Sequence, residues 1–591
     1  MCSVVGYKKL KKDTSISSDF IKNSFDLMKS RGPDNKAYKI VDKLCALGHQ
    51  RLSIIDVDDE ANQPMTFDDC TIVFNGEIYN YIELKQELEK NNILFVTNSD
   101  TEVLLKGFVT FGISFLNKVN GMFAFAIYNN KTHELILVRD RFGVKPLHYM
   151  IQDEVLYFSS EIKPLISIKK NKKMNMNVYR NFFDHMATDY NEETFIKDIY
   201  QIKKGHYMII KDSYEEKQWY FGNDFIFDES IFKDKQKTLQ FVEDTLVSAI
   251  DYRMRADVPI CLTLSGGIDS TTLYTLVKER LHRDIKLFTF IHPESDTNEY
   301  DKVIKLADSY SDIVCTVQSD NTNSFEKLKE DLDVVEFPIW GISTRAYRDM
   351  YNSIKQGGFK VVIEGHGSDE QLGGYPYMIE SAFYDYLKKL NFIKAFDILK
   401  LEHETGHSGL GNKSNYYKKT IKSIAKFILK RKNIRYFQEN IDWTFEFKIL
   451  PIVLRAFDRL SMGSSVESRA PFMDYRVVEL FKKLPLEYKV NKLGSKAILR
   501  EILKKYKKTY IYEDKQKMGF ASDIPSFFNN VENKELSKEY IEKFNMNEFE
   551  TQKEKALEAI NKNKIEWSDT FEMSKVLTVS IINEKYGFEN D

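Results

Sequence analysis

The chain has 591 residues, of which 42% are hydrophobic and 13% aromatic, so it can bury more than one sizeable core. Its 86 basic and 88 acidic residues leave a formal net charge of −2, which gives no electrostatic reason to expect nucleic acid or an anionic membrane as a partner. Five cysteines without a CxxC spacing, apolar runs too short for a bilayer and no signal peptide together predict a cytoplasmic protein with reduced thiols.

The first residues, Met1-Cys2-Ser3, place a cysteine where removal of the methionine would expose its α-amine. That amine, with a reference pKa of about 7.7–8.0, can serve as the base for its own thiol. Taken alone, Cys2 is more simply a chance neighbour of the initiator methionine, so the case for a nucleophile depends on motifs further along the chain.

Two later stretches carry groups that suit an amino-acid substrate and an oxyanion. Arg51, in the motif HQRLSIID, can clamp a carboxylate. An apolar strand over residues 71–74 is predicted to end at Asn75-Gly76. A side-chain amide beside a glycine N–H makes a two-donor oxyanion site.

The motif Ser99-Asp100-Thr101-Glu102 opens a helical pattern over residues 103–108. Asp100 can hold a substrate ammonium group or cap the helix, and from this motif alone capping is the simpler interpretation. Together with three further motifs, these stretches resemble the glutaminase domain of N-terminal-nucleophile (class II) amidotransferases. The three motifs are RGPD at 31–34, NGMFAFA at 120–126 and RDRFGVKPL at 139–147.

The resemblance covers residues 2–210 and implies a sandwich of two antiparallel sheets between helices. Alternating patterns over residues 134–138 and 155–159 agree with strands of such a sandwich. The resemblance implies hydrolysis of glutamine, with the nucleophile Cys2, the oxyanion donors Asn75 and Gly76, and the glutamine-binding residues Arg51, Asn75, Glu77 and Asp100.

Residues 211–236 are polar, acidic and aromatic without a clean periodicity, and we expect them to hold a linker and the last strand of the first domain. A second domain then covers residues 237–591. Apolar residues at helical spacing predict that it begins with a helix over residues 237–253.

The second domain is organised around an apolar strand over residues 258–264, the turn Ser265-Gly-Gly-Ile-Asp-Ser270 and a helix over residues 271–282. Strand, glycine turn and helix aim backbone N–H groups at an anion, and the two glycines let a phosphate approach closely. Asp269 is a poor neighbour for a phosphate unless Mg²⁺ lies between them. An ordinary turn between a strand and a helix is the alternative.

Two more apolar strands, over residues 286–291 and 359–364, alternate with helical patterns, which predicts a parallel sheet with helices on both faces. The second strand leads into EGHGSDEQLGG, where Asp369 can supply another carboxylate for Mg²⁺. Lys496, in the motif SKAILR, can neutralise the charge of a leaving pyrophosphate. Without their partners, a glycine-rich helix cap and a solvated lysine are the simpler interpretations.

The turn resembles the SGGxDS pyrophosphate loop of ATP pyrophosphatases, and residues 2–530 together resemble a glutamine-hydrolysing asparagine synthetase. The resemblance implies an α/β synthetase domain with added helices, ATP and Mg²⁺ as cofactors, and glutamine and aspartate as substrates; relatives often form homodimers. The residues it implies are Leu264, Ser265, Gly266, Gly267, Asp269, Ser270 and Gly365 for ATP, Asp269 and Asp369 for the metal, and Lys496 and His366 for catalysis.

In the implied reaction, the side-chain carboxylate of aspartate attacks the α-phosphorus of ATP and gives a β-aspartyl-adenylate and pyrophosphate. Ammonia released at Cys2 crosses a dry internal tunnel, which keeps it unprotonated, and displaces AMP to give asparagine. The main alternative is the same chemistry on another carboxylate, such as a uronic-acid sugar or a peptide side chain. A third is a catalytically silent binding protein, against which the complete set of site residues argues.

His366 departs from the family pattern, because asparagine synthetases commonly have Glu at this position, in SGEGSDE. That Glu is thought to take a proton from the incoming ammonia. A histidine, with a reference pKa near 6.5, can also be a base, although its shorter and rigid side chain reshapes the pocket. Alternatively, His366 only packs the loop.

Three stretches lie outside these motifs. Residues 413–435 are basic with interleaved apolar positions, which fits a solvated helix better than a membrane or nucleic-acid surface, because acidic residues elsewhere balance the charge. The motif KQKMGF at 515–520 is expected near the ATP site. Residues 532–591 are expected to be helical, with Trp567 and Phe571 packing back on the protein.

Overall fold

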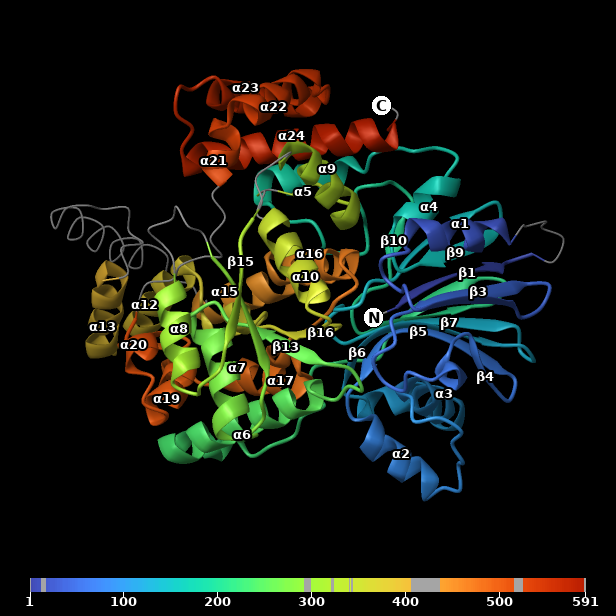
Figure 1. Cartoon of the computed structure of the whole chain (residues 1–591), viewed down its shortest axis with the longest axis horizontal. Coiled ribbons are helices and arrows are strands. Elements are labelled where there is room, and N and C mark those ends of the chain that lie inside the picture. Colours follow the sequence, from blue (N-terminus) through green and yellow to red (C-terminus); the bar gives the residue numbers. More distant parts are fainter. Residues whose placement is uncertain are drawn as a thin grey trace.

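The computed structural model describes residues 2–11, 18–291, 299–319, 324–339, 341, 344–404, 436–514 and 524–588. The two basic stretches at 413–435 and 515–520 lie outside these residues. Two sheet-containing halves lie side by side, and a layer of C-terminal helices extends across the top of both (Figure 1). None of the helices among the described residues is both long and apolar enough to cross a bilayer.

The N-terminal half contains two six-stranded antiparallel sheets, in the orders β10-β8-β9-β1-β3-β2 and β12-β11-β7-β6-β5-β4. The strands are β1 Ser3–Lys9, β2 Asn35–Ile40, β3 Cys45–Arg51, β4 Met65–Phe67, β5 Cys70–Ile78, β6 Gly121–Asn129, β7 Glu134–Arg139, β8 His148–Gln152, β9 Val155–Ser159, β10 Tyr200–Gln201, β11 His206–Ile210 and β12 Tyr214–Gln218.

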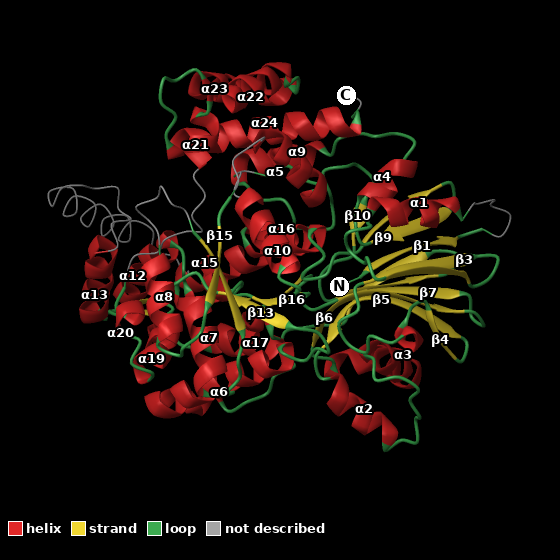
Figure 2. Ribbon diagram, viewed as in Figure 1, coloured by secondary structure: helices red, strands yellow, loops and turns green. Residues whose placement is uncertain are grey.

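Side-chain alternation along the strands builds this half as a sandwich. In β1, Val4 packs between the sheets, whereas Val5 packs outward against α1 (Asp19–Leu27) and α4 (Lys163–Ile168). In β5, Val73 packs inward, whereas Phe74 packs outward against α2 (Tyr81–Glu89) and α3 (Asp100–Phe111). Two sheets lie between two helical layers (Figure 2), so the predicted αββα sandwich is confirmed.

The segment between the halves contains the strand β12, which extends the second sheet, and α6 (Lys235–Arg253) comes after it. The structure therefore places the last strand of the first half beyond residue 210, within the stretch expected to hold it. Helix α6 begins two residues before the predicted 237–253, because Asp234 caps it by accepting from the N–H groups of Gln236 and Lys237.

The C-terminal half contains a five-stranded parallel sheet in the order β15-β14-β13-β16-β17. Leu262 of β13 packs on one face with α6 and α7, and Cys261 packs on the other with α9, α10 and α16. This confirms the predicted parallel sheet with helices on both faces. The elements are β13 Ile260–Thr263, β14 Lys286–Phe290, β15 Val314–Val317, β16 Val361–Ile363, β17 Glu467–Arg469, α7 Ile268–Glu279, α8 Tyr300–Asp308, α9 Ser324–Val335, α10 Thr344–Gln356, α16 Leu450–Gly463, α17 Tyr475–Lys483 and α19 Ala497–Lys505.

The remaining helices surround this sheet and form the layer above it. They are α11 Ser368–Leu372, α12 Pro376–Lys388, α13 Phe392–Glu404, α15 Tyr436–Trp443, α18 Leu486–Lys489, α20 Thr509–Tyr512, α21 Ile524–Asn529, α22 Val531–Lys543, α23 Glu550–Ile560 and α24 Thr570–Tyr586. A short hairpin joins β18 (Val490–Asn491) and β19 (Gly494–Ser495).

The last helices dock on α5 (Met176–His185) of the N-terminal half. The rings of Phe183 and Phe549 stack with 4.3 Å between their centroids, and Lys575 Nζ donates to the Phe183 carbonyl at 2.9 Å. The expectation that Trp567 packs back is wrong, since half of its surface is exposed. The apolar face of α24 supplies the packing instead, and the indole lies at the end of a helix.

We expect Ile582→Ala in α24 to destabilise the protein by about 2–5 kcal/mol, because it empties space in a packed core. Ile582 is 1% exposed, whereas Ile226, the matched control for the same substitution, is 89% exposed. Urea unfolding of both variants checks this. Equal midpoints for the two variants would contradict the docking of α24.

Candidate active sites

Cys2 lies at the start of β1, and both of its main-chain polar groups are held. Its nitrogen donates to Asn75 Oδ1 at 3.2 Å, and its carbonyl accepts from Arg31 Nε at 3.2 Å. Burial raises the pKa of the Cys2 thiol to about 11, so the thiol is protonated at neutral pH. A base is therefore needed before this sulfur can attack, and the nearest group of that kind is the α-amine that loss of Met1 would create.

Asn75 presents a donor that nothing described in the structure uses. Its Oδ1 accepts from Cys2, while its Nδ2 is buried without a hydrogen-bond partner among the described residues. A Cβ on Gly76 would lie 2.1 Å from the carbonyl oxygen of Met122, so only glycine fits there. The prediction that the strand ends at Asn75 is wrong: β5 stays paired with β6 as far as Ile78, because Gly76 lets the two backbones approach closely.

The other predicted glutamine-binding residues surround this pair as buried charges. Glu77 pairs with Arg469 of the C-terminal half, at 3.3 Å between Oε2 and Nη2. Asp100 Oδ2 accepts from the N–H of Ile78 at 2.9 Å, and burial raises the pKa of Asp100 to about 6. The interpretation of Asp100 as a helix cap is wrong, since Ser99 caps α3 by accepting from Glu102.

Both terminal nitrogens of the Arg51 guanidinium group are already hydrogen-bonded within the protein. Its Nη1 donates to the Asp58 carbonyl and to Asn62 Oδ1, both at 2.8 Å, and its Nη2 donates to the carbonyls of Ile55 and Asp56. These bonds fasten the loop after β3. A carboxylate that Arg51 binds with two hydrogen bonds has to replace at least one of them.

The predicted phosphate loop is a tight turn between β13 and α7. Gly266 takes φ +77°, and a Cβ there would lie 3.0 Å from Glu299 Cβ. The hydroxyls of Ser265 and Ser270 lie 3.1 Å apart, and Gly267 is the N-cap of α7, so backbone N–H groups gather at the turn. Leu264 is buried and donates its N–H to the Phe288 carbonyl at 2.8 Å.

The second loop touches the first. A Cβ on Gly365 would lie 2.9 Å from Asp269 Cβ, so the approach of the two loops requires glycine there. Lys496 then joins them: its ammonium contacts Asp269 and lies 2.8 Å from Asp369 Oδ1. Although burial opposes the charged form, these two carboxylates raise the pKa of Lys496. Lys496 also takes φ +56°, a strained conformation typical of functional positions.

The two carboxylates fit a magnesium ion. Asp269 Oδ1 is buried with no hydrogen-bond partner among the described residues. Asp369 contacts the same Lys496 ammonium as Asp269, so the two carboxylates lie close together. Oxygen ligands from one or two carboxylates suit Mg²⁺. The described residues bring no cluster of three or more potential metal ligands together, so other positions are left to phosphate oxygens and water.

His366 lies on the loop between Gly365 and Asp369. Its ring packs against the tilted ring of Phe457 of α16 with 3.4 Å between centroids and 33° between planes, and its Nε2 lies 3.4 Å from Glu364 Oε2. A fifth of the His366 side chain is exposed. Position 366 therefore carries no carboxylate, but Glu364, two residues earlier in the chain, supplies one beside the imidazole.

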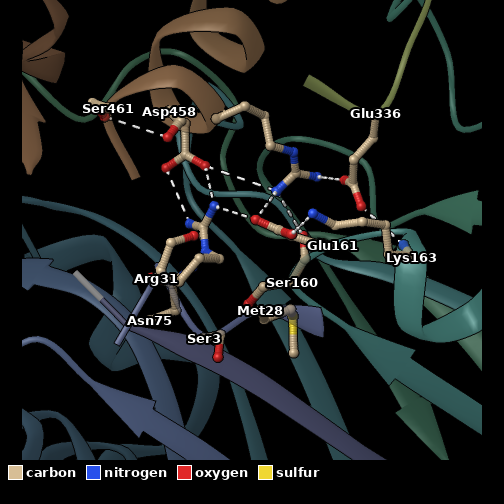
Figure 3. A network of polar contacts seen from close by, with 12 residues as sticks. Ser3, Met28, Arg31, Asn75, Ser160, Glu161, Lys163, Glu336, Asp458 and Ser461 are labelled. Carbon is tan, nitrogen blue, oxygen red and sulfur yellow. Dashed lines mark hydrogen bonds and ion pairs between the residues drawn. The ribbon is translucent and has the colours of Figure 1, made fainter. Parts of the chain in front are cut away.

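A buried network of charges links the surroundings of Cys2 to the C-terminal half (Figure 3). Arg31, which holds the Cys2 carbonyl, forms a bidentate pair with Asp458 of α16, at 2.9 and 3.3 Å. Although burial opposes ionisation, Arg31 and Lys145 lower the pKa of Asp458 to about 2. The neighbouring Arg459 pairs with Glu336 at 3.0 Å.

The predicted residues therefore gather in two groups rather than lying scattered. One group contains Cys2, Asn75, Gly76, Glu77 and Asp100, and the other contains the glycine turn, Asp369 and Lys496. Comparison with known proteins bears on what these sites belong to. A family model described as a glutamine amidotransferase domain matches residues 1–221, and one described as asparagine synthase matches residues 242–580, more than half of the chain.

The chain belongs to the asparagine synthase family.

Curated relatives of this family differ in what they are named for. Asparagine synthetase (glutamine-hydrolyzing) 1 of Bacillus subtilis is 27% identical over 579 residues, which cover 90% of this chain and 89% of that protein. Amidase chry2 of Gibberella zeae is 29% identical, over 60% of this chain and 55% of that protein. Amidase chyE of Penicillium rubens is 24% identical, over 84% of each chain.

Three buried residues of this asparagine synthase family member were missed as site residues. Arg31 stands in the motif RGPD, which signals the family but not its contact with Cys2. Asp458 has no signal, because its partner lies 427 positions away in the chain. Gly374 has a sequence signal, because it is a glycine in the run that follows Asp369. In the structure, a Cβ at this position would lie 1.6 Å from Asp369 Oδ1.

We expect Gly374→Ala to push the Asp369 carboxylate out of place and to weaken binding of ATP with Mg²⁺ roughly ten- to hundredfold. Isothermal titration calorimetry measures this. The control is Gly358→Ala, which adds a methyl group with no atom within 4 Å at a position whose φ is +85°. Unchanged affinity for ATP with Mg²⁺ in Gly374→Ala would contradict the role of Asp369 as a metal ligand.

Proposed function

We propose that this protein transfers the amide nitrogen of glutamine to the side-chain carboxylate of aspartate, through a β-aspartyl-adenylate, and forms asparagine, glutamate, AMP and pyrophosphate. The observation that carries the proposal is the contact of Lys496 with both Asp269 and Asp369. It brings the glycine turn and the second loop to one place in the same chain as the buried Cys2.

At the first site, Cys2 attacks the side-chain amide of glutamine. The α-amine exposed after removal of Met1 takes the proton of the thiol, which the high pKa of the thiol makes necessary. The unpaired Nδ2 of Asn75 and the N–H of Gly76 stabilise the oxyanion. Asp100 holds the α-ammonium of the substrate, and Glu77 lies beside it.

At the second site, the turn from Ser265 to Ser270 binds the phosphates of ATP through backbone N–H groups. Asp269 and Asp369 would hold Mg²⁺, which supplies charge neutralisation between carboxylates and phosphates when it is bound. Lys496 is then free to bind the departing pyrophosphate. His366 faces the adenylate from the same loop and takes a proton from the attacking ammonia.

Ammonia passes between the sites without leaving the protein. Support for this comes from α16, since Asp458 contacts Arg31 at the first site while its neighbour Phe457 packs against His366 at the second. Free ammonia is mostly protonated in water at neutral pH and is then not nucleophilic, so an enclosed path preserves its reactivity.

A second candidate is the same transfer to a different carboxylate. His366 favours it, because an imidazole in place of a carboxylate changes the shape and charge of the acceptor pocket. The names of the two amidases among the relatives also point away from a single acceptor.

Pyrophosphate release with ATP, Mg²⁺ and glutamine, with and without aspartate, tests the proposal. We expect release that depends on aspartate and is accompanied by asparagine. Release that requires another acid would select the second candidate, and no release with any acid would favour a silent binding protein. Cys2→Ala should abolish synthesis from glutamine and leave synthesis from ammonium salts intact.

We also expect the KM for glutamine to rise about tenfold per pH unit below pH 6, because protonated Asp100, whose pKa is about 6, cannot bind an ammonium group. Glutaminase assays from about pH 5 to about pH 8 measure this. Asp100→Asn should raise KM throughout and abolish the dependence. Asp26→Asn, at an exposed position of α1, is the control, and a KM independent of pH in the wild type would contradict the role of Asp100.

A further inference from the structure

Glu364 is a buried carboxylate to which neither half of the proposed reaction assigns a role. It lies directly after β16, is 4% exposed, and its N–H donates to the Arg469 carbonyl at 2.9 Å, which extends the pairing of β16 with β17. A buried carboxylate is costly unless several donors satisfy it. The two oxygens of Glu364 therefore need donors close by.

Three rigid elements hold the Glu364 carboxylate in one orientation. The Tyr351 hydroxyl on α10 donates to Oε2 at 2.8 Å, the Ser468 hydroxyl on β17 donates to the same oxygen, and the Thr263 hydroxyl on β13 reaches Oε1 at 3.4 Å. Two of these hydroxyls come from strands of the central sheet. Side chains anchored on strands and helices are placed more accurately than side chains on loops.

The fourth neighbour of this carboxylate is His366. The His366 Nε2 lies 3.4 Å from Glu364 Oε2, and it is buried with no hydrogen-bond partner among the described residues. Phe457 packs against the imidazole, with 33° between the two ring planes, and restricts the rotation of the ring. Glu364 thus faces one ring nitrogen, which leaves the other as the proton acceptor.

We propose that Glu364 is the positioning residue that holds His366 as the base of the amide-forming step. The inference rests on the proposed function and assigns to a pair of side chains the task that a single carboxylate at position 366 would perform. A histidine whose second nitrogen faces a carboxylate is fixed in one tautomer.

The amide-forming step conserves atoms and electrons. The ammonia nitrogen attacks the acyl carbon of the adenylate and forms a C–N bond. One proton moves from that nitrogen to the ring nitrogen of His366 that does not face Glu364. The C–O bond to AMP then breaks, its electron pair leaves with the phosphate oxygen, and the imidazolium later releases its proton to water.

Glu364→Gln tests the pair, because it keeps the shape of the side chain and removes its charge. With ammonium as the nitrogen source, we expect kcat for amide formation to fall at least about tenfold, a part of the roughly 10²–10⁴-fold that a general base contributes. The KM for ATP and the glutaminase rate should not change.

Tyr351→Phe is the matched control, since it removes a hydrogen bond to Glu364 and leaves the charge in place. Its kcat should fall less than about threefold. If Tyr351→Phe lost as much as Glu364→Gln, the effect would come from the hydrogen-bond network, and the proposal would be overturned.

A spectroscopic measurement tests the pair without any acceptor. In protein labelled with ¹⁵N-histidine, the His366 signals are identified by their loss in His366→Gln. We expect the ring-nitrogen shifts of neutral His366 to show one tautomer, with the proton on Nε2, in the wild type, and a mixture of the two tautomers in Glu364→Gln. Unmoved shifts would overturn the proposal. If no acid supports pyrophosphate release, the proposed function fails, whereas these shifts still decide whether Glu364 and His366 act as a pair.

Discussion

The buried pair of Arg31 and Asp458 is the contact on which the arrangement of both sites depends. Arg31 is fully buried and holds the carbonyl of Cys2, and its charge is shared between Asp458 of the other half and Glu161 of its own half. Removing one partner of a buried ion pair typically costs about 3–5 kcal/mol. Docking of the two halves therefore stabilises the arginine that holds the main chain of Cys2.

The same helix relates the two chemistries in space. Asp458 and Phe457 are neighbours in α16, and they contact Arg31 and His366 respectively. A helix is stiff over such a short distance, so a displacement of Asp458 against Arg31 also displaces Phe457 against His366. The family assignment explains why the two sites share one chain, and α16 shows what joins them physically.

Much of this architecture could be predicted because its signals are local. Alternation along residues 134–138 and 155–159 marks strands of the sandwich, and the glycines after residue 264 mark the tight turn between β13 and α7. Asp269 and Asp369 could be paired in advance, because loops at the carboxyl ends of parallel strands meet at one edge of a sheet. Glu364 and Asp458 could not be predicted, because their meaning comes from partners on other elements. Arg51 was only partly foreseen, since its bonds to the loop after β3 depend on how that loop folds.

The docking of α24 on α5 links the order of synthesis to the order of assembly. Residues 570–586 leave the ribosome after every strand of both halves, yet they contribute to the core beside residues 176–185. Residues 570–586 must therefore be synthesised before the protein can close around its own N-terminal half. A nascent chain that has already folded its first sandwich still lacks the packing of α24 on α5. A product truncated before α24 would lack this packing permanently.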